Sequence, residues 1–215
     1  MFSLVDRRLY LCTPVRDDLE TFVSATVAGG VDVVQLRDKR RPRDEQLAAG
    51  RLLSAICRDL GVPFIVNDDP TLALEVNADG VHVGQDDESV ARCRAVLGDD
   101  AIVGLSTHAR SEFDDALHQR ATYFSAGPLV PTPTKEGRPG TGLTYALDCH
   151  TRSDRPVFVT GGVDATNVTW LVRAGLRHFV VVRALTESST PRESAASIRR
   201  ALDEALSAVP IEPAQ

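Results

Sequence analysis

Eight short apolar segments alternate with longer amphipathic segments along the chain, and this alternation limits the fold more than any other feature. The apolar segments run without polar alternation, as strands do when both faces of a parallel sheet are covered. They span residues 8–12, 31–36, 64–67, 80–84, 102–106, 122–126, 157–160 and 178–182. The intervening segments repeat apolar residues at helical spacing, and glycines stand where helix C-terminal caps are expected, at Gly29, Gly30, Gly61, Gly98 and Gly175.

Strand–helix order repeated eight times predicts an α/β fold, a single (β/α)8 TIM barrel over residues 1–215. An open, doubly wound sheet is the alternative. The first strand is followed by Leu-Cys-Thr-Pro at residues 11–14 rather than by a glycine-rich phosphate loop, which disfavours dinucleotide binding. No linker divides the chain, and only the tail, residues 210–215, is expected to fray.

Composition excludes several classes of function. The chain is 43% hydrophobic and 25% charged, as ordinary globular proteins are. It has no apolar run long enough to span a bilayer and no signal segment, so we expect a cytoplasmic protein without a membrane partner. The net charge of -6 disfavours nucleic-acid binding, so any anionic ligand must meet a local positive patch. Four cysteines without metal-ligand spacing predict buried, reduced thiols.

A cluster of cations follows the second expected strand. Gln35, Arg37 and Lys39 alternate and therefore share one face of an extended chain. A helix expected to start near Asp44 would repel these cations, which makes sense if they hold an anion such as phosphate against the helix N-terminus. A solvated basic turn is the alternative, and it explains the arginines within residues 40–43 better than it explains Arg37 and Lys39.

Carboxylates follow the third and fourth expected strands. Asp68 and Asp69 come after the third strand, and three acidic residues occupy positions 86–88 after the fourth. Mg²⁺ takes one or two carboxylates and completes its shell with water and phosphate oxygens. Helix capping is the alternative for these acids. The residues favour Asp68 together with Asp86 or Asp87, and this choice stays open at this point.

The later strand ends carry further polar groups. Ser106, at the end of the fifth strand, can donate to a phosphate, whereas His108 is either an acid–base group or a polar residue that opens a helix. His82 lies within an apolar strand and is interpreted as a hydrogen-bonded core histidine. Gly161 and Gly162 follow the seventh strand, where this fold usually binds phosphate. A second anion site, without metal, is therefore expected there.

Residues 127–142 form a long segment that no regular element explains. Prolines at 128, 131 and 133 forbid a helix, and three glycines follow between 137 and 142. We interpret the segment as a mobile lid that carries Thr132, Thr134 and the cation Lys135. A solvated surface loop is the alternative.

Taken together, these motifs resemble the thiamine phosphate synthase family in order from about Leu9 to Leu185. The motifs are Gln35-Leu-Arg37-Asp-Lys39, Asn67-Asp68, the stretch Asp79 to Asp87, Gly104-Leu-Ser106, and the stretch Gly127 to Lys135. The resemblance implies a TIM-barrel transferase of class EC 2.5.1.3. It would join 4-amino-2-methyl-5-hydroxymethylpyrimidine diphosphate to hydroxyethylthiazole phosphate and release diphosphate.

The resemblance also implies roles for individual residues. Asp68 and Asp87 would bind Mg²⁺, which decides the earlier choice in favour of Asp87. Arg37, Lys39, Ser106 and Lys135 would be catalytic, by neutralising the diphosphate as it leaves in a dissociative step. The substrate-binding set would comprise Gln35, Leu36, Arg37, Asp38, Lys39, Asn67, Ser106 and Lys135, with Thr132, Pro133, Thr134, Gly162, Val182 and Arg183 on the thiazole phosphate side. The family commonly has serine where this chain has Arg183.

Two other functions remain open. A thiazole tautomerase of the same fold would need an acid–base residue such as His108, but an isomerase has no diphosphate to bind. A non-catalytic sensor of thiamine precursors could use the same pocket. In either case the expected partners are small molecules, and self-association into a homo-oligomer is left open.

Overall fold

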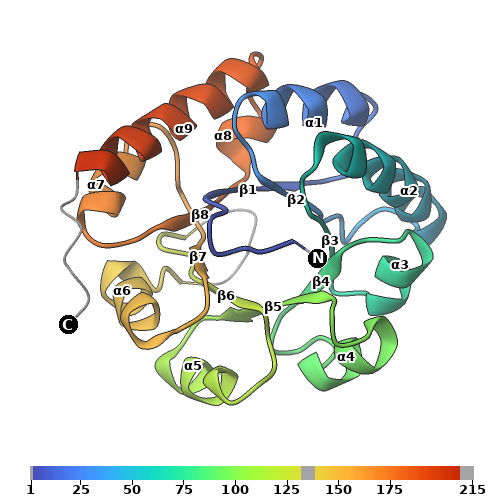
Figure 1. Ribbon diagram of the computed structural model, residues 1–215, viewed down its shortest axis with the longest axis horizontal. Coiled ribbons are helices and arrows are strands. Elements are labelled where there is room, and N and C mark those ends of the chain that lie inside the picture. Colours follow the sequence, from blue (N-terminus) through green and yellow to red (C-terminus); the bar gives the residue numbers. More distant parts are fainter. Residues whose placement is uncertain (1, 132–138, 209–215) are drawn as a thin grey trace.

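Eight parallel strands form one closed barrel in the computed structural model, which describes residues 2–131 and 139–208. The strands follow one another around the barrel in sequence order, and β1 pairs with β8 to close it. Helices surround the barrel as an outer ring (Figure 1). The predicted (β/α)8 TIM barrel is therefore confirmed. The predictions for Thr132, Pro133, Thr134, Lys135 and the tail lie outside the described residues.

The strands are β1 (Leu9–Thr13), β2 (Val33–Leu36), β3 (Phe64–Asn67), β4 (Gly80–Val83), β5 (Ile102–Thr107), β6 (Tyr123–Ala126), β7 (Val157–Val159) and β8 (His178–Val181). The described helices are α1 (Leu19–Ala28), α2 (Arg43–Leu60), α3 (Pro70–Glu75), α4 (Val90–Leu97), α5 (Arg110–Leu117), α6 (Gly142–Arg152), α7 (Val168–Arg173), α8 (Arg183–Thr186) and α9 (Pro191–Ala208). Each strand lies within two residues of its predicted bounds, because apolar β-rich runs end where turn residues begin.

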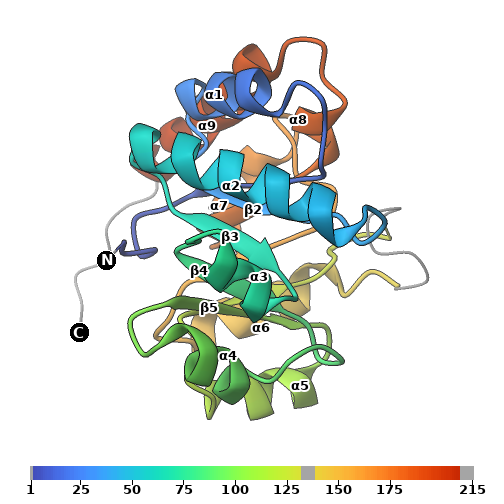
Figure 2. The same cartoon turned by 90° about the vertical axis from the view of Figure 1, so that its right-hand side faces the viewer.

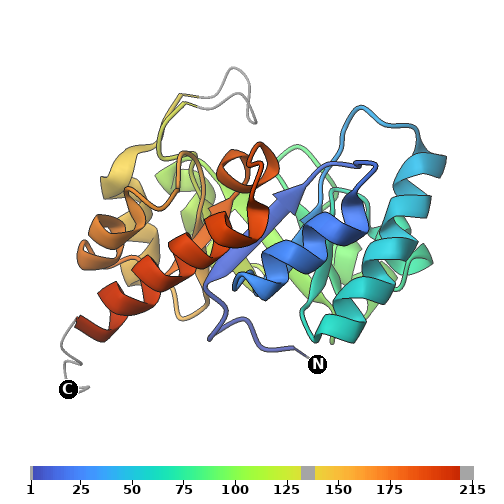
Figure 3. The same cartoon turned by 90° about the horizontal axis from the view of Figure 1, so that it is seen from above.

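The helices pack in sequence order around the barrel. Helix α9 lies between α1 and α7 on one flank (Figure 3), and α2, α3 and α4 follow one another on another flank (Figure 2). Two helices follow β8, because the short α8 turns the chain at the rim before α9 returns along the outside. All four cysteines are free and buried, as predicted. None of the helices described here is long and apolar enough to cross a membrane.

The barrel has two hydrophobic cores, one on each side of the sheet. Side chains that point outward pack against the helices and include Leu11, Val34 and Phe124. Their neighbours in the strands point inward and form a second cluster that includes Tyr10 and Tyr123. This assignment follows from the period of two along a strand. Leu4, ahead of β1, joins the inner cluster and is 2% exposed.

We expect the buried His178, in β8, to make the free energy of unfolding depend on pH. Its side chain is 6% exposed, and Nδ1 donates to the Arg7 carbonyl over 2.6 Å. Burial lowers the pKa of His178 to about 4, against the opposing effect of the Arg7 carbonyl and with help from the positive charges of Arg8, His150 and Arg177. The imidazole is therefore neutral in the folded protein at pH values where it is charged in the unfolded chain.

We expect the free energy of unfolding to fall as the pH is lowered from about 6.5 to 4. The folded pKa lies below the unfolded value, so the unfolded state binds more protons in this window and gains stability on acidification. The His178 contribution is at most about 3 kcal/mol. Urea denaturation across this pH range measures it. His178→Asn should reduce the dependence of the free energy of unfolding on pH, whereas the same change at the exposed His118 should not. Equal pH profiles for the two variants would show that His178 is not the source of the dependence.

Candidate active site

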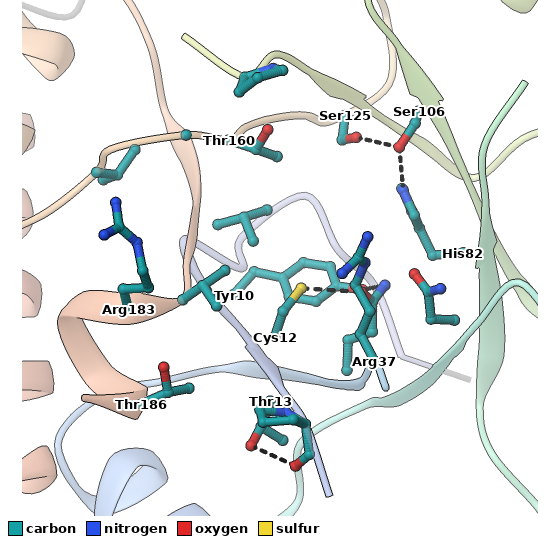
Figure 4. A pocket seen from close by; sticks show the side chains of 18 of the residues that line it. Tyr10, Cys12, Thr13, Arg37, His82, Ser106, Ser125, Thr160, Arg183 and Thr186 are labelled. Carbon is teal, nitrogen blue, oxygen red and sulfur yellow. Dashed lines mark hydrogen bonds between the residues drawn. The ribbon is translucent and has the colours of Figure 1, made fainter. Parts of the chain in front are cut away.

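A pocket of about 1080 Å³ opens at the carboxyl ends of the barrel strands. Figure 4 shows side chains from strands and from the segments that follow them converging on it, among them Arg37, Ser106 and Arg183. The sequence-predicted residues that line it are Gln35, Arg37, Asp38, Lys39, Asn67, Asp68, Asp87, Ser106, Gly162, Val182 and Arg183. Segments far apart in sequence meet here because parallel strands place all their carboxyl ends at one face.

Two carboxylates and one cation meet at the ends of β2, β3 and β4. Lys39 Nζ lies 2.6 Å from Asp68 Oδ2. Burial raises the pKa of Asp68, and the neighbouring Asp87 carboxylate raises it further, while Lys39 lowers it. Asp68 also has a positive φ of 64°, which is uncommon for a residue with a side chain and typical of functional sites. Asp68 and Asp87 therefore lie close enough for their carboxylates to interact.

The acids around this pair fall into two groups. Asp69 caps α3, since its side chain accepts from the Leu72 amide over 2.8 Å, so the capping alternative holds for this residue. Asp87 accepts from the Gly84 amide over 2.9 Å and lines the pocket, ahead of a helix that Ser89 caps. Asp86 is not among the lining residues. The structure thus places Asp87, rather than Asp86, beside Asp68.

In the motif from Gln35 to Lys39, Leu36 and Asp38 have structural roles. Leu36 is 2% exposed and points outward into the core between sheet and helices, so its side chain does not line the pocket. Asp38 lines the pocket and also organises the loop, because its carboxylate accepts from the amides of Val15, Arg40 and Arg41. Asp38 therefore shapes the rim that carries Arg37 and Lys39.

The floor of the pocket is a continuous series of hydrogen bonds. Ser106 Oγ contacts Ser125 Oγ at 3.0 Å and His82 Nε2 at 2.8 Å (Figure 4). His82 Nδ1 lies 2.9 Å from the Tyr123 hydroxyl, which lies 2.9 Å from the Tyr10 hydroxyl. The series ends at the amide of Gln35, which donates from Nε2 to Tyr10 over 3.0 Å and accepts at Oε1 from the Cys12 thiol over 3.0 Å. We call these seven residues the floor chain.

Most of the floor chain was not predicted as part of the site. Tyr10, Cys12, Tyr123 and Ser125 were included in apolar strands, and His82 was interpreted as a hydrogen-bonded core histidine, which it is. The signal that identifies them is the period of two within each strand, since every second residue of a barrel strand points inward. Thr160, at the end of β7, also lines the pocket and has a buried hydroxyl without a partner among the described atoms.

The ends of β7 and β8 form the other side of the pocket. Gly161 and Gly162 have φ values of 93° and 78°, a region that side chains disfavour. The Asn167 side chain fixes their loop by donating to the Gly162 carbonyl over 2.6 Å and accepting from the Asp164 amide over 3.1 Å. Arg183 begins α8 and lines the pocket. A cation and close-approach glycines suit a second anion site.

Gly161→Ala is expected to lower the free energy of unfolding by about 2–5 kcal/mol. The left-handed φ costs about 1–2 kcal/mol, and overpacking adds about 1–3 kcal/mol, because a Cβ here would lie 2.5 Å from Pro128 Cβ and 2.8 Å from the Leu129 amide nitrogen. Gly61→Ala is the matched control, since Gly61 has φ 69° and open space around its Cβ position. Urea denaturation compares them, and equal losses would show that packing against residues 128–129 is unimportant.

His108 has a structural role at the rim. Its Nδ1 donates to the Gly127 carbonyl, and its backbone amide donates to Glu112 over 2.7 Å at the start of α5. His108 lines the pocket and ties the end of β6 to the end of β5.

A TIM barrel whose strand ends gather cations, paired carboxylates and close-approach glycines around one pocket defines a phosphate-binding barrel enzyme. The family model described as thiamine monophosphate synthase matches residues 9–185. Thiamine-phosphate synthase of Streptomyces avermitilis is 43% identical over 206 residues, covering 93% of this chain and 95% of that protein. That of Mycobacterium tuberculosis is 40% identical over 213 residues, covering 93% and 96%.

The solved structures agree with the sequence comparisons. Thiamine phosphate pyrophosphorylase from Pyrococcus furiosus superposes with a TM-score of 0.84 and 25% identity, covering 94% of this chain and 98% of that one. The chain belongs to the thiamine monophosphate synthase family. The comparisons do not support a thiazole tautomerase or a non-catalytic sensor.

Proposed function

We propose that this protein synthesises thiamine phosphate from 4-amino-2-methyl-5-hydroxymethylpyrimidine diphosphate and hydroxyethylthiazole phosphate, with release of diphosphate. The observation that carries the proposal is the group formed by Lys39, Asp68, Asp87 and Ser106 at neighbouring strand ends of one pocket. Such a group can bind a diphosphate and stabilise it as it leaves. The family match over residues 9–185 supports this substrate.

The reaction requires no nucleophile from the protein. The thiazole nitrogen carries a lone pair and forms the new C–N bond to the methylene carbon of the pyrimidine, while the bond from that carbon to the diphosphate oxygen breaks. The aminopyrimidine can delocalise the positive charge left behind, so a dissociative path is favourable. The task of the protein would be to stabilise the charge that grows on the diphosphate. Of the residues that line the pocket, Arg37 and Lys39 would neutralise this charge and Ser106 would donate a hydrogen bond to it.

The residues present fit a magnesium ion. Asp68 and Asp87 lie close enough for their carboxylates to raise the pKa of Asp68, and Lys39 supplies the positive charge beside them in this structure. Two carboxylates would be enough, because Mg²⁺ completes its shell with water and phosphate oxygens. When bound, Mg²⁺ would neutralise charge on the diphosphate.

The second anion site would take the thiazole phosphate. Gly162 and the end of β8 would approach it with backbone groups, and Arg183 would offer a forked cation where the family commonly has serine. By the family resemblance, Thr132, Pro133, Thr134 and Lys135 would complete this side of the pocket. We place the reaction in the cytoplasm, where a reducing environment suits four free, buried cysteines.

A direct assay tests the proposal. Purified protein, both substrates and Mg²⁺ should give thiamine phosphate and one equivalent of diphosphate, and omission of either substrate should abolish both products. Diphosphate release that does not depend on the thiazole phosphate would indicate hydrolysis. Binding of both substrates without product would indicate a sensor, and conversion of a thiazole isomer alone would indicate a tautomerase.

A further inference from the structure

If the proposed function holds, the floor chain would connect the two ends of the pyrimidine diphosphate site. Ser106 stands at the end where the diphosphate would bind, and Gln35 stands at the far end, both as pocket-lining residues. Between them lie His82, Tyr123 and Tyr10, joined by the contacts of 2.8–3.0 Å given above. All five residues are buried. Side chains this buried make most of their hydrogen bonds to one another, and only the groups that face the pocket remain for a ligand.

Each link of the floor chain can run in either direction. Hydroxyl hydrogens rotate, a neutral imidazole carries its proton on either nitrogen, and a primary amide can turn by 180°. Adjacent links are not independent, however. A hydroxyl has one hydrogen, so a serine or tyrosine that donates to one neighbour must accept from every other neighbour that it contacts. A neutral imidazole obeys the same rule.

The diphosphate selects one of the two directions. Phosphate oxygens only accept, so Ser106 must donate to them and accept from His82 Nε2–H. Nδ1 of His82 then accepts from the Tyr123 hydroxyl, which in turn accepts from Tyr10. Tyr10 must accept from Gln35 Nε2, which turns the Gln35 carbonyl oxygen toward the Cys12 thiol. This is the orientation that the structure shows for Gln35.

The orientation of the Gln35 amide decides which pyrimidine edge it can recognise. One N–H of Nε2 and one lone pair of Oε1 are engaged by Tyr10 and Cys12, which leaves one donor on Nε2 and one acceptor on Oε1 for a ligand. This pair matches a ring nitrogen and an adjacent amino group, as amide side chains match adenine. A 4-oxo pyrimidine offers the inverse pattern, a ring N–H and a carbonyl, which requires the amide to turn over.

We propose that the floor chain makes discrimination between amino- and oxo-pyrimidines depend on the bound diphosphate, with His82, Tyr123 and Tyr10 as positioning residues. This inference rests on the proposed function. Turning the Gln35 amide to suit a 4-oxo ring would reverse every link and force Ser106 to donate to His82 instead of to the diphosphate. The oxo substrate therefore loses a hydrogen bond at one end of the site or at the other.

Cutting the chain in the middle tests the proposal. Tyr123→Phe removes the hydroxyl that joins the two halves, so the Gln35–Tyr10 half can turn independently of Ser106. The ratio of kcat/KM for the 4-amino and 4-oxo pyrimidine diphosphates should fall by up to about tenfold, the value of one hydrogen bond. Tyr10→Phe should lower the amino-to-oxo ratio in the same way. This second variant provides the test if Tyr123→Phe does not fold.

Ser125→Ala is the matched control. Ser125 belongs to the floor chain but lies beyond Ser106, outside the path to Gln35. Its removal should leave the amino-to-oxo ratio within about twofold of wild type, even if kcat changes for both substrates. An unchanged ratio in Tyr123→Phe and Tyr10→Phe, or an equal loss in Ser125→Ala, would overturn the proposal.

The tautomer of His82 gives an independent measurement on the wild-type protein. With ¹⁵N-labelled histidine and saturating inorganic diphosphate and Mg²⁺, the His82 signals should show a protonated Nε2 and an unprotonated Nδ1, with His82→Gln used only to assign them. A protonated Nδ1 or a doubly protonated ring would refute the mechanism. Formation of thiamine phosphate by the wild type would meanwhile leave the proposed function intact.

Discussion

Lys39→Ala is expected to lower kcat about ten- to hundredfold, with a smaller change in KM for the pyrimidine diphosphate. Lys39 Nζ lies 2.6 Å from Asp68 in a pocket that also holds Asp87, so its ammonium group is at the place where the diphosphate would gain charge. A hydrogen bond between charged groups is worth about 1.5–3 kcal/mol. The whole of this energy lowers the barrier only if the hydrogen bond forms in the transition state and not in the bound substrate. Steady-state kinetics with saturating thiazole phosphate and Mg²⁺ measure the effect.

Arg41→Ala is the control for Lys39→Ala. Arg41 belongs to the same basic turn but pairs with Glu45 over 3.0 Å and does not line the pocket, so its loss should leave kcat within about twofold. A substrate with a less basic leaving group should recover part of the Lys39→Ala defect, because less charge then needs stabilising. A raised KM with unchanged kcat would instead show that Lys39 binds ground state and transition state equally.

Asp87→Asn is expected to raise the Mg²⁺ concentration needed for half-maximal activity by at least about tenfold, since even outer partners of metal ligands are worth that much. The substitution removes one charge from the Asp68–Asp87 pair. In the wild type, Asp87 accepts a hydrogen bond from the Gly84 amide over 2.9 Å. The asparagine keeps a side-chain oxygen that can accept this hydrogen bond, so the loop should keep its shape. A Mg²⁺ titration of activity, with thermal unfolding to verify folding, gives the measurement.

Asp86→Asn separates the metal site from a general effect of negative charge. Asp86 is adjacent in sequence but does not line the pocket, so its Mg²⁺ titration should match that of wild type. If Asp86→Asn requires more Mg²⁺ and Asp87→Asn does not, the ion is held by other residues. Equal shifts in both variants would indicate screening by net charge rather than coordination.

The predicted part of the site consists of residues at strand ends. Arg37, Lys39, Asp68 and Ser106 could be found because each follows an apolar run, and the barrel order implies that such positions share one face. The choice of Asp87 over Asp86 did not follow from the acidic run itself. It came from the family resemblance, and the contact between the Asp68 and Asp87 carboxylates agrees with it.

The floor of the pocket could not be predicted from apolar runs. In β1 and β6, tyrosines alternate with outward-facing apolar residues, so each strand has the composition of a fully buried strand. Only closure of the barrel brings Tyr10 and Tyr123, 113 positions apart, to a hydroxyl separation of 2.9 Å. No local pattern contains that distance, because it depends on the register of strands that are not neighbours in sequence.

The sequence by itself determined the fold, the strand bounds and the charged groups at the strand ends, since hydrophobic period and turn residues act over a few positions. The tertiary structure decided which of these groups touch. It placed Leu36 in the outer core, used Asp69 as a cap for α3, and joined Ser106 to Gln35 through His82 and two tyrosines. Those outcomes depend on side-chain direction and strand register around a closed barrel, which are set by packing over the whole chain.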